Sequence, residues 1–289
     1  MGHGAAAEVE GNSESKFQVA SFVGKGHLLA SYTNGFWNVG PEHGFLPMRH
    51  PLARLPSPTF DVLQALLSQL PAILAAQDVA ARVEALPSTL LDDVLAQDDV
   101  FVQAALYRGL TFLSSGFLLE PAHHALDADG KYGKARTVLP AILARPLTHL
   151  AKKLGVHPYL DYHYAYSLGN YIQTVPEFDS PSGAFDQSNL QMAVAFSGGP
   201  DERGFIMLHV DIDSHSPALL ESVYSFVDKP SVEALQRGHQ AMQTINARRR
   251  LMWQASDPKR YNDFRAYIMG ITGNVGEWRV PGTSQCVTS

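Results

Sequence analysis

Residues 204–216 read GFIMLHVDIDSHS, and the conformation of this stretch decides what kind of fold the chain adopts. In a strand, four polar side chains at alternate positions would share one face, like a set of metal ligands: His209, Asp211, Asp213 and His215. In a helix, the same side chains form two pairs on different faces. The flanks favour the helix, because the turn-forming run SGGPDE precedes the stretch and an apolar-periodic segment ending at Phe226 follows it. We therefore predict a helix and no four-ligand metal site, with a strand-borne metal site of a hydrolase as the alternative.

The same helical period recurs on both sides of this stretch. Its apolar positions predict helices at about residues 60–70, 88–97, 99–119, 140–154, 158–173, 187–196, 203–227, 230–254 and 257–270. Pro71 is expected to interrupt the first of them, because proline lacks the N–H that a helix needs. Strand signals are sparse, so the predicted fold class is all-α.

Composition shifts along the chain predict two domains. Residues 1–40 are polar and Gly-rich and are expected to form a flexible N-terminal arm. Residues 41–175 are expected to form a small helical domain, and the stretch at 176–187, rich in Pro, Ser, Gly and Asp, a linker. Residues 188–289 then form a second helical domain, which completes a two-domain helical bundle.

Bulk composition excludes several classes of protein. Of the 289 residues, 45% are hydrophobic and 17% charged, which is typical of a soluble globular protein. A formal net charge of −6 argues against a nucleic-acid partner, and the single cysteine cannot form an intrachain disulfide. The first residues lack the apolar core of a signal peptide, and the most apolar stretch, residues 60–76, is too polar to span a membrane. We expect a cytoplasmic protein that binds neither nucleic acid nor membrane.

Four blocks, in this order, carry a resemblance to a known family. They are GFLP at Gly44 with PLARLP at Pro51, VLPAILARPLTHLAKKLGVHPYLDYHYAYSLGNY at residues 138–171, FSGGPDERGFIMLHVDID at 196–213 and FRAYIMGITGN at 264–274. In this order they resemble the indoleamine 2,3-dioxygenase family, over about residues 44–280. The resemblance implies an all-helical haem enzyme with a small N-terminal and a large C-terminal domain. Such an enzyme opens the pyrrole ring of tryptophan with dioxygen, as in the kynurenine pathway.

The resemblance also implies roles for the residues that match the family's motifs. The implied substrate-binding residues are His163, Tyr166, Ser167, Phe205, Tyr261, Phe264 and Arg265. His209 stands at the family's distal serine and Arg265 at the arginine that pairs with the substrate carboxylate, so these two are the implied catalytic residues. A guanidinium grips a carboxylate through two parallel hydrogen bonds, and aromatic faces suit an indole. The family usually places a tyrosine where His163 stands, so this position departs from the family's pattern.

One departure from the family concerns the haem. The resemblance implies haem b as the cofactor, held by a histidine on a helix well beyond the last block, yet no histidine follows His239. By resemblance, residues 188–289 are therefore a large domain truncated at its C-terminus, and the iron ligand is unknown, with His209 and His239 as candidates. Three explanations stay open: a truncated product that cannot hold haem normally, haem held by another histidine, or a loss of catalysis.

Plainer interpretations stay open for the two implied catalytic residues. The position of His209 is also compatible with a histidine at a helix interface that pairs with Asp213, or with an iron ligand. That of Arg265 is also compatible with a surface arginine that pairs with Asp263 or Glu277. The function that we predict is a monomeric haem-dependent dioxygenase that acts on L-tryptophan or a related indole with O2. The alternatives are a haem-dependent aromatic monooxygenase of the same superfamily and a catalytically inactive, truncated helical homologue.

Overall fold

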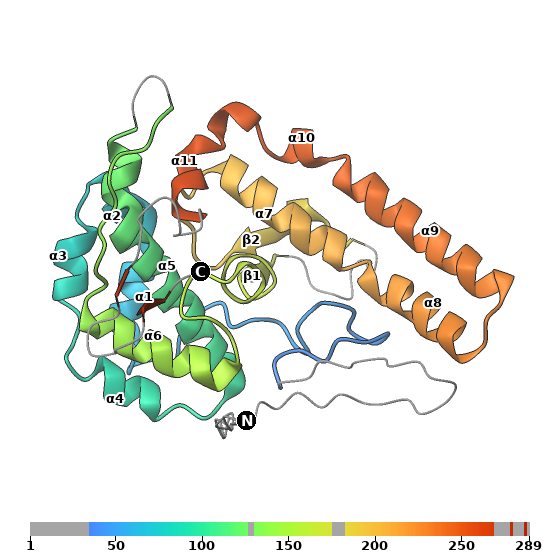
Figure 1. Cartoon of the computed structure of the whole chain (residues 1–289), viewed down its shortest axis with the longest axis horizontal. Coiled ribbons are helices and arrows are strands. Elements are labelled where there is room, and N and C mark those ends of the chain that lie inside the picture. Colours follow the sequence, from blue (N-terminus) through green and yellow to red (C-terminus); the bar gives the residue numbers. More distant parts are fainter. Residues whose placement is uncertain (1–34, 127–129, 175–182, 269–277, 280–285, 288–289) are drawn as a thin grey trace, which may run out of the picture.

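The chain is mostly helical in this computed structural model, which describes residues 35–126, 130–174, 183–268, 278–279 and 286–287 (Figure 1). Its α-helices are α1 (Asp61–Ser68), α2 (Leu70–Ala75), α3 (Val79–Glu84), α4 (Leu90–Leu95), α5 (Val100–His124), α6 (Ala141–Leu154), α7 (Pro200–Asp213), α8 (Ser216–Asp228), α9 (Val232–Arg249), α10 (Met252–Ala255) and α11 (Asn262–Arg265). Shorter turns are the π-helical η1 (Tyr162–Tyr166) and the 3-10 turns η3 (Gln187–Asn189), η4 (Pro258–Arg260) and η5 (Ala266–Ile268). The strands are β1 (Tyr171–Gln173), β2 (Leu190–Met192), β3 (Trp278–Arg279) and β4 (Cys286–Val287). The predicted helical fold class is confirmed.

The long helix α5 forms the core of the first half of the chain. Nearly all of its side chains are buried, because α6, η1 and the short helices α1 to α3 contact it (Figure 1). The carboxylate of Asp99 begins the helix by accepting hydrogen bonds from the backbone N–H groups of Phe101, at 2.7 Å, and Val102, at 3.3 Å. The helix predicted at 99–119 is thus confirmed, and it continues to His124.

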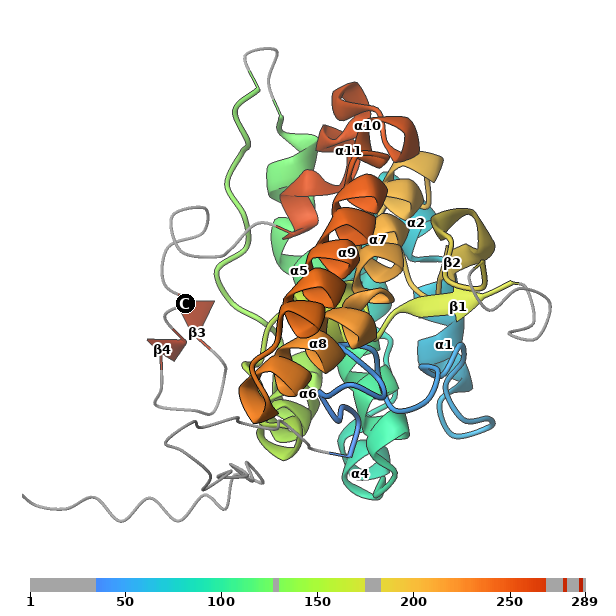
Figure 2. The ribbon, with the colours of Figure 1, turned by 90° about the vertical axis from the view of Figure 1, so that its right-hand side faces the viewer.

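Helix α7 lies between α5 and α9, and α8 continues beyond its end along α9 (Figure 1). Figure 2 shows α9 in front of α7 and α5 behind them, and α7 contacts both α9 and α10. The contact with α10 depends on Gly204, because a Cβ there would lie 1.7 Å from the carbonyl oxygen of Ala255. The helix predicted for residues 203–212 is confirmed, so the polar residues of this stretch do not share one strand face.

A small antiparallel sheet replaces two of the predicted helices. Strands β1 and β2 pair with Tyr171 opposite Met192, so the helices predicted at 158–173 and 187–196 are wrong except for the short turns η1 and η3. The backbone folds back tightly at Gly169, where a Cβ would lie 1.8 Å from the carbonyl oxygen of Tyr164. Next to it, the side-chain amide of Asn170 accepts a bond from the N–H of Val194 at 2.9 Å and donates one to its carbonyl oxygen at 2.8 Å. These contacts join segments far apart in sequence, and they override the local helical period.

Other differences concern where helices begin and end. The helix predicted at 203–227 is two helices, because α7 ends at Asp213 and Pro217, in the first turn of α8, has no N–H to continue it. The helix predicted at 230–254 is divided into α9 and α10, and the one predicted at 257–270 consists of short turns as far as Ile268. The interruption predicted at Pro71 is confirmed, because α1 ends at Ser68 and α2 begins at Leu70, with Pro71 in its first turn, where the missing N–H costs little.

The two-domain division stays a prediction. The predicted arm at 1–40 falls mostly on residues 1–34, and the predicted linker at 176–187 partly on residues 176–182, and both of these ranges lie outside the described residues. Across the described ranges, no helix is long and apolar enough to cross a membrane.

Candidate functional site

The first turn of α7 is anchored by a buried carboxylate. Glu202 is fully buried and accepts hydrogen bonds from the backbone N–H groups of Phe196 at 2.9 Å, Ser197 at 2.7 Å and Gly198 at 3.1 Å. The hydroxyl of Tyr166 donates a further bond to it at 3.0 Å. Because a negative charge at a helix N-terminus is favourable, this carboxylate both begins α7 and ties it to η1.

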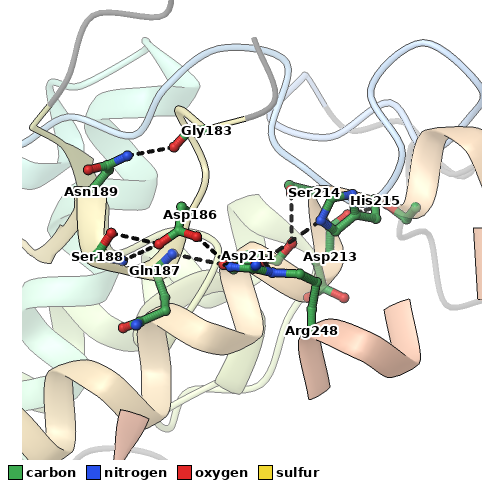
Figure 3. Close-up of polar contacts among 11 residues, drawn as sticks. Gly183, Asp186, Gln187, Ser188, Asn189, Asp211, Asp213, Ser214, His215 and Arg248 are labelled. Atoms are coloured by element: carbon green, nitrogen blue, oxygen red, sulfur yellow. Dashed lines mark hydrogen bonds and ion pairs between the residues drawn. The ribbon is translucent and has the colours of Figure 1, made fainter. Parts of the chain in front are cut away.

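The last turn of α7 is anchored by an arginine from α9. Arg248 donates from Nε to Oδ1 of Asp211 at 2.7 Å and from Nη2 to the second oxygen of that carboxylate (Figure 3). The same Nη2 reaches Asp186 at 2.7 Å, and the backbone N–H of Gln187 donates to Asp211 at 2.8 Å. The hydrogen bond to Asp211 raises the pKa of Arg248 above its usual range. Burial opposes this rise, and the bond to Asp186 and the charges of both carboxylates add to it. Together these contacts fix the end of α7 against α9 and the loop before β2.

The predicted helical pairing of Asp211 with His215 is confirmed, with Nε2 3.8 Å from the carboxylate. Within the described ranges, no three His, Cys, Asp or Glu side chains gather into a metal site. The strand-borne metal site of a hydrolase, the alternative for residues 204–216, is contradicted because residues 200–213 form a helix.

His209 lies between these two anchors, and its hydrogen bond determines which ring nitrogen carries the proton. Its Nδ1 is 2.7 Å from the carbonyl oxygen of Phe205. A carbonyl oxygen only accepts, so Nδ1 donates and the Nε2 of the neutral ring keeps its lone pair. Burial lowers the pKa of His209, the bond to Phe205 opposes this, and the charge of His163 lowers it further. At neutral pH, Nε2 is therefore a hydrogen-bond acceptor.

Aromatic rings connect His209 to the last helical turns of the described chain. The ring centroid of Phe205 is 4.9 Å from that of His209, 5.3 Å from that of Tyr261 and 6.0 Å from that of Phe264. The guanidinium of Arg265 lies 5.6 Å from the ring centroid of Tyr261. The structure thus brings together five residues that the sequence singled out. Phe264 is fully buried, whereas Arg265 is exposed to solvent.

The remaining residues singled out by sequence lie apart from this cluster or are engaged in packing. Tyr166 and Ser167 are fully buried; Tyr166 binds Glu202, and the hydroxyl of Ser167 donates to the carbonyl oxygen of Tyr162 at 3.0 Å. His163 lies at the wall of a separate cavity, and His239 is exposed on α9.

Sequence reasoning missed Tyr162. Its ring lies edge-on to that of His209, with centroids 5.5 Å apart. Its hydroxyl is buried and has no hydrogen-bond partner among the described residues. Burial, followed by the charges of Asp213 and Tyr261, raises the pKa of Tyr162 above its usual range. The one signal for it in the sequence is its spacing of four residues from Tyr166, which places both on one side of a helical turn.

Comparisons with known proteins identify the family of the chain. The family model "Indoleamine 2,3-dioxygenase" matches residues 34–280. An indoleamine 2,3-dioxygenase of Saccharomyces cerevisiae is 31% identical over 63% of this chain and 38% of its own length. Indoleamine 2,3-dioxygenase 2 of Mus musculus is 26% identical over 83% of this chain and 56% of its own length, and a relative from Penicillium citrinum is 28% identical over 66% and 40%.

The chain spans about half the length of these curated relatives. The family model, in contrast, covers most of the chain, from before the first described helix to beyond α11. The chain belongs to the indoleamine 2,3-dioxygenase family.

Proposed function

We propose that the surface formed by Phe205, His209, Tyr261 and Arg265, here called the indole face, binds an indole amino acid, L-tryptophan or a close relative. This surface would be the substrate side of a haem-dependent dioxygenase. The observation that carries the proposal is the orientation of His209. With its Nδ1–H bound to the carbonyl oxygen of Phe205, its Nε2 can accept the N–H of an indole ring. The same orientation argues against a distal role for His209 as a hydrogen-bond donor to oxygen.

The groups beside His209 suit the rest of such a substrate. Phe205 and Tyr261 offer aromatic faces, on which an indole gains a large apolar contact. Arg265, exposed at the edge of Tyr261, is free to pair with a carboxylate through two parallel hydrogen bonds. In this proposal the four side chains recognise one molecule: His209 its N–H, Phe205 and Tyr261 its ring, and Arg265 its carboxylate.

The chemistry of this face is compatible with haem. Aromatic rings such as Phe205 suit contact with a flat macrocycle, and the lone pair on Nε2 of His209 suits either an indole N–H or iron. A haem bound beside this face would supply the iron that activates dioxygen. The protein's own groups would orient the indole and exclude water from it. His239, the other candidate iron ligand, is exposed on α9.

Binding measurements on matched ligands test the recognition. Calorimetry would compare L-tryptophan, its 1-methyl derivative, which lacks the N–H, and tryptamine, which lacks the carboxylate. His209→Leu is expected to weaken L-tryptophan roughly threefold to tenfold and leave the 1-methyl derivative unchanged, as for loss of one hydrogen bond. Arg265→Gln is expected to weaken L-tryptophan but not tryptamine. His239→Leu, an exposed control, is expected to change none of the three.

Two outcomes would overturn the proposal. One is an equal affinity of His209→Leu and His239→Leu for L-tryptophan, since the imidazole would then make no contact with the indole. The other concerns the reaction of the haem-supplemented chain with dioxygen. A product carrying two added oxygen atoms supports the dioxygenase, and a product carrying one assigns the chain to the aromatic monooxygenases instead.

A further inference from the structure

A cavity of about 440 Å³ lies at the end of α7, beyond His209. Apolar side chains form much of its wall, among them Trp37 and Phe45, and its polar groups come from Asp161, His163 and Asp213. A cavity of this volume, mostly apolar with a few polar groups, is typical of a small-molecule site. None of the roles proposed above for the indole face uses it.

The two carboxylates at this cavity differ in their partners. That of Asp161 accepts the backbone N–H of Tyr164 at 2.8 Å and so begins the turn η1. That of Asp213 makes no hydrogen bond or ion pair with the described residues, although the side chain is partly buried. Burial raises the pKa of Asp213 to about 6, against the opposing effect of His163. A carboxylate in such surroundings is stabilised by a cation that enters the cavity.

The position of Asp213 separates this cavity from the indole face. Asp213 follows Phe205 by eight residues of one helix, a rise of about 12 Å at 1.5 Å per residue. Arg265 contacts the ring of Tyr261, which in turn contacts Phe205. None of Phe205, His209, Tyr261 and Arg265 lines the cavity, so its occupant is treated as a second molecule.

We propose that this cavity is a second binding site, for a small primary amine with an apolar body. The ammonium group of the amine pairs with the carboxylate of Asp213 and so supplies the counter-charge that this carboxylate lacks. Its apolar body packs against Trp37 and Phe45, whose rings also favour a nearby cation. The proposal rests on the cavity and the unpaired carboxylate of Asp213, and it holds whether or not the indole face binds an indole.

Two ligands of equal shape test the role of charge. Calorimetry at pH 7.5 would compare 2-phenylethylamine, which is a cation, with 2-phenylethanol, which is neutral. The amine is expected to bind at least tenfold more tightly to the wild-type chain. Asp213→Asn is expected to abolish this preference, whereas Asp228→Asn, at the exposed end of α8, is expected to retain it. Equal affinities for amine and alcohol, binding of neither at millimolar concentration, or an unchanged preference in Asp213→Asn would each refute the proposal.

A second variant keeps the test independent of the carboxylate. Val156→Phe adds a ring at the cavity wall and is expected to weaken the amine at least fivefold. A thermal unfolding curve for each variant shows whether it is folded. If Val156→Phe is folded and binds the amine as the wild type does, the amine binds elsewhere and the cavity is not the site.

Discussion

Replacing Arg248 by glutamine is expected to lower the free energy of unfolding by about 3 kcal/mol. The variant leaves the carboxylate of Asp211 without its charged partner, and that side chain is only 2% exposed. Removing one member of a buried ion pair costs roughly 3–5 kcal/mol. The lower end of that range applies here, because the Arg248 side chain is 25% exposed and water can replace part of its interaction. The backbone N–H of Gln187 also continues to bind Asp211.

Urea unfolding followed by circular dichroism measures the change. Arg249→Gln is the matched control, because this next arginine of α9 is exposed, and its unfolding free energy is expected to change by less than about 0.5 kcal/mol. Adding Asp211→Asn to Arg248→Gln removes the buried charge and is expected to restore part of the loss. The reasoning is refuted if Arg248→Gln and Arg249→Gln unfold at the same urea concentration, since Arg248 would then not anchor α7.

Three further predictions concern α7. Glu202→Gln is expected to lose about 2–4 kcal/mol in equilibrium unfolding, because a neutral amide cannot accept all the bonds that the buried carboxylate accepts; a loss below about 0.5 kcal/mol would contradict this. Gly204→Ala is expected to lose about 3 kcal/mol in thermal unfolding, because its Cβ would clash with the carbonyl oxygen of Ala255, whereas Gly40→Ala, with nothing within 4 Å, should melt as the wild type does. The raised pKa of Asp213, about 6, means that the folded state holds this proton more tightly than the unfolded state, so the group stabilises the fold at low pH relative to neutral pH. Asp213→Asn is therefore expected to be more stable than the wild type at pH 7.5, with a gain that shrinks between pH 6 and pH 4; a gain that does not change with pH would argue against the raised pKa.

The long helices of this fold could be predicted because their apolar positions follow the helical period without interruption. Helix α6 begins and ends close to the predicted residues for that reason, and α5 begins close to its predicted start but continues to His124. The pairing of β1 with β2 could not be predicted in this way. It depends on contacts such as that of Asn170 with Val194, which are 24 residues apart and leave no local pattern.

The same distinction applies to the candidate site. Phe205 and His209 are four residues apart on one helix, so their contact follows from the sequence once the helix is accepted. The contact of Phe205 with Tyr261 crosses 56 residues and was expected only through the family resemblance. Asp213 was placed in sequence beside His209 as its partner, but the structure gives His209 the carbonyl oxygen of Phe205 instead. The resulting unpaired carboxylate follows from packing that local pattern does not encode.

The position of His163 has a consequence for both ends of α7. Its charge lowers the pKa of His209 and also that of Asp213. The side chain of His163 therefore links the electrostatics of His209 to those of Asp213, so that replacing this one residue alters the surroundings of both groups.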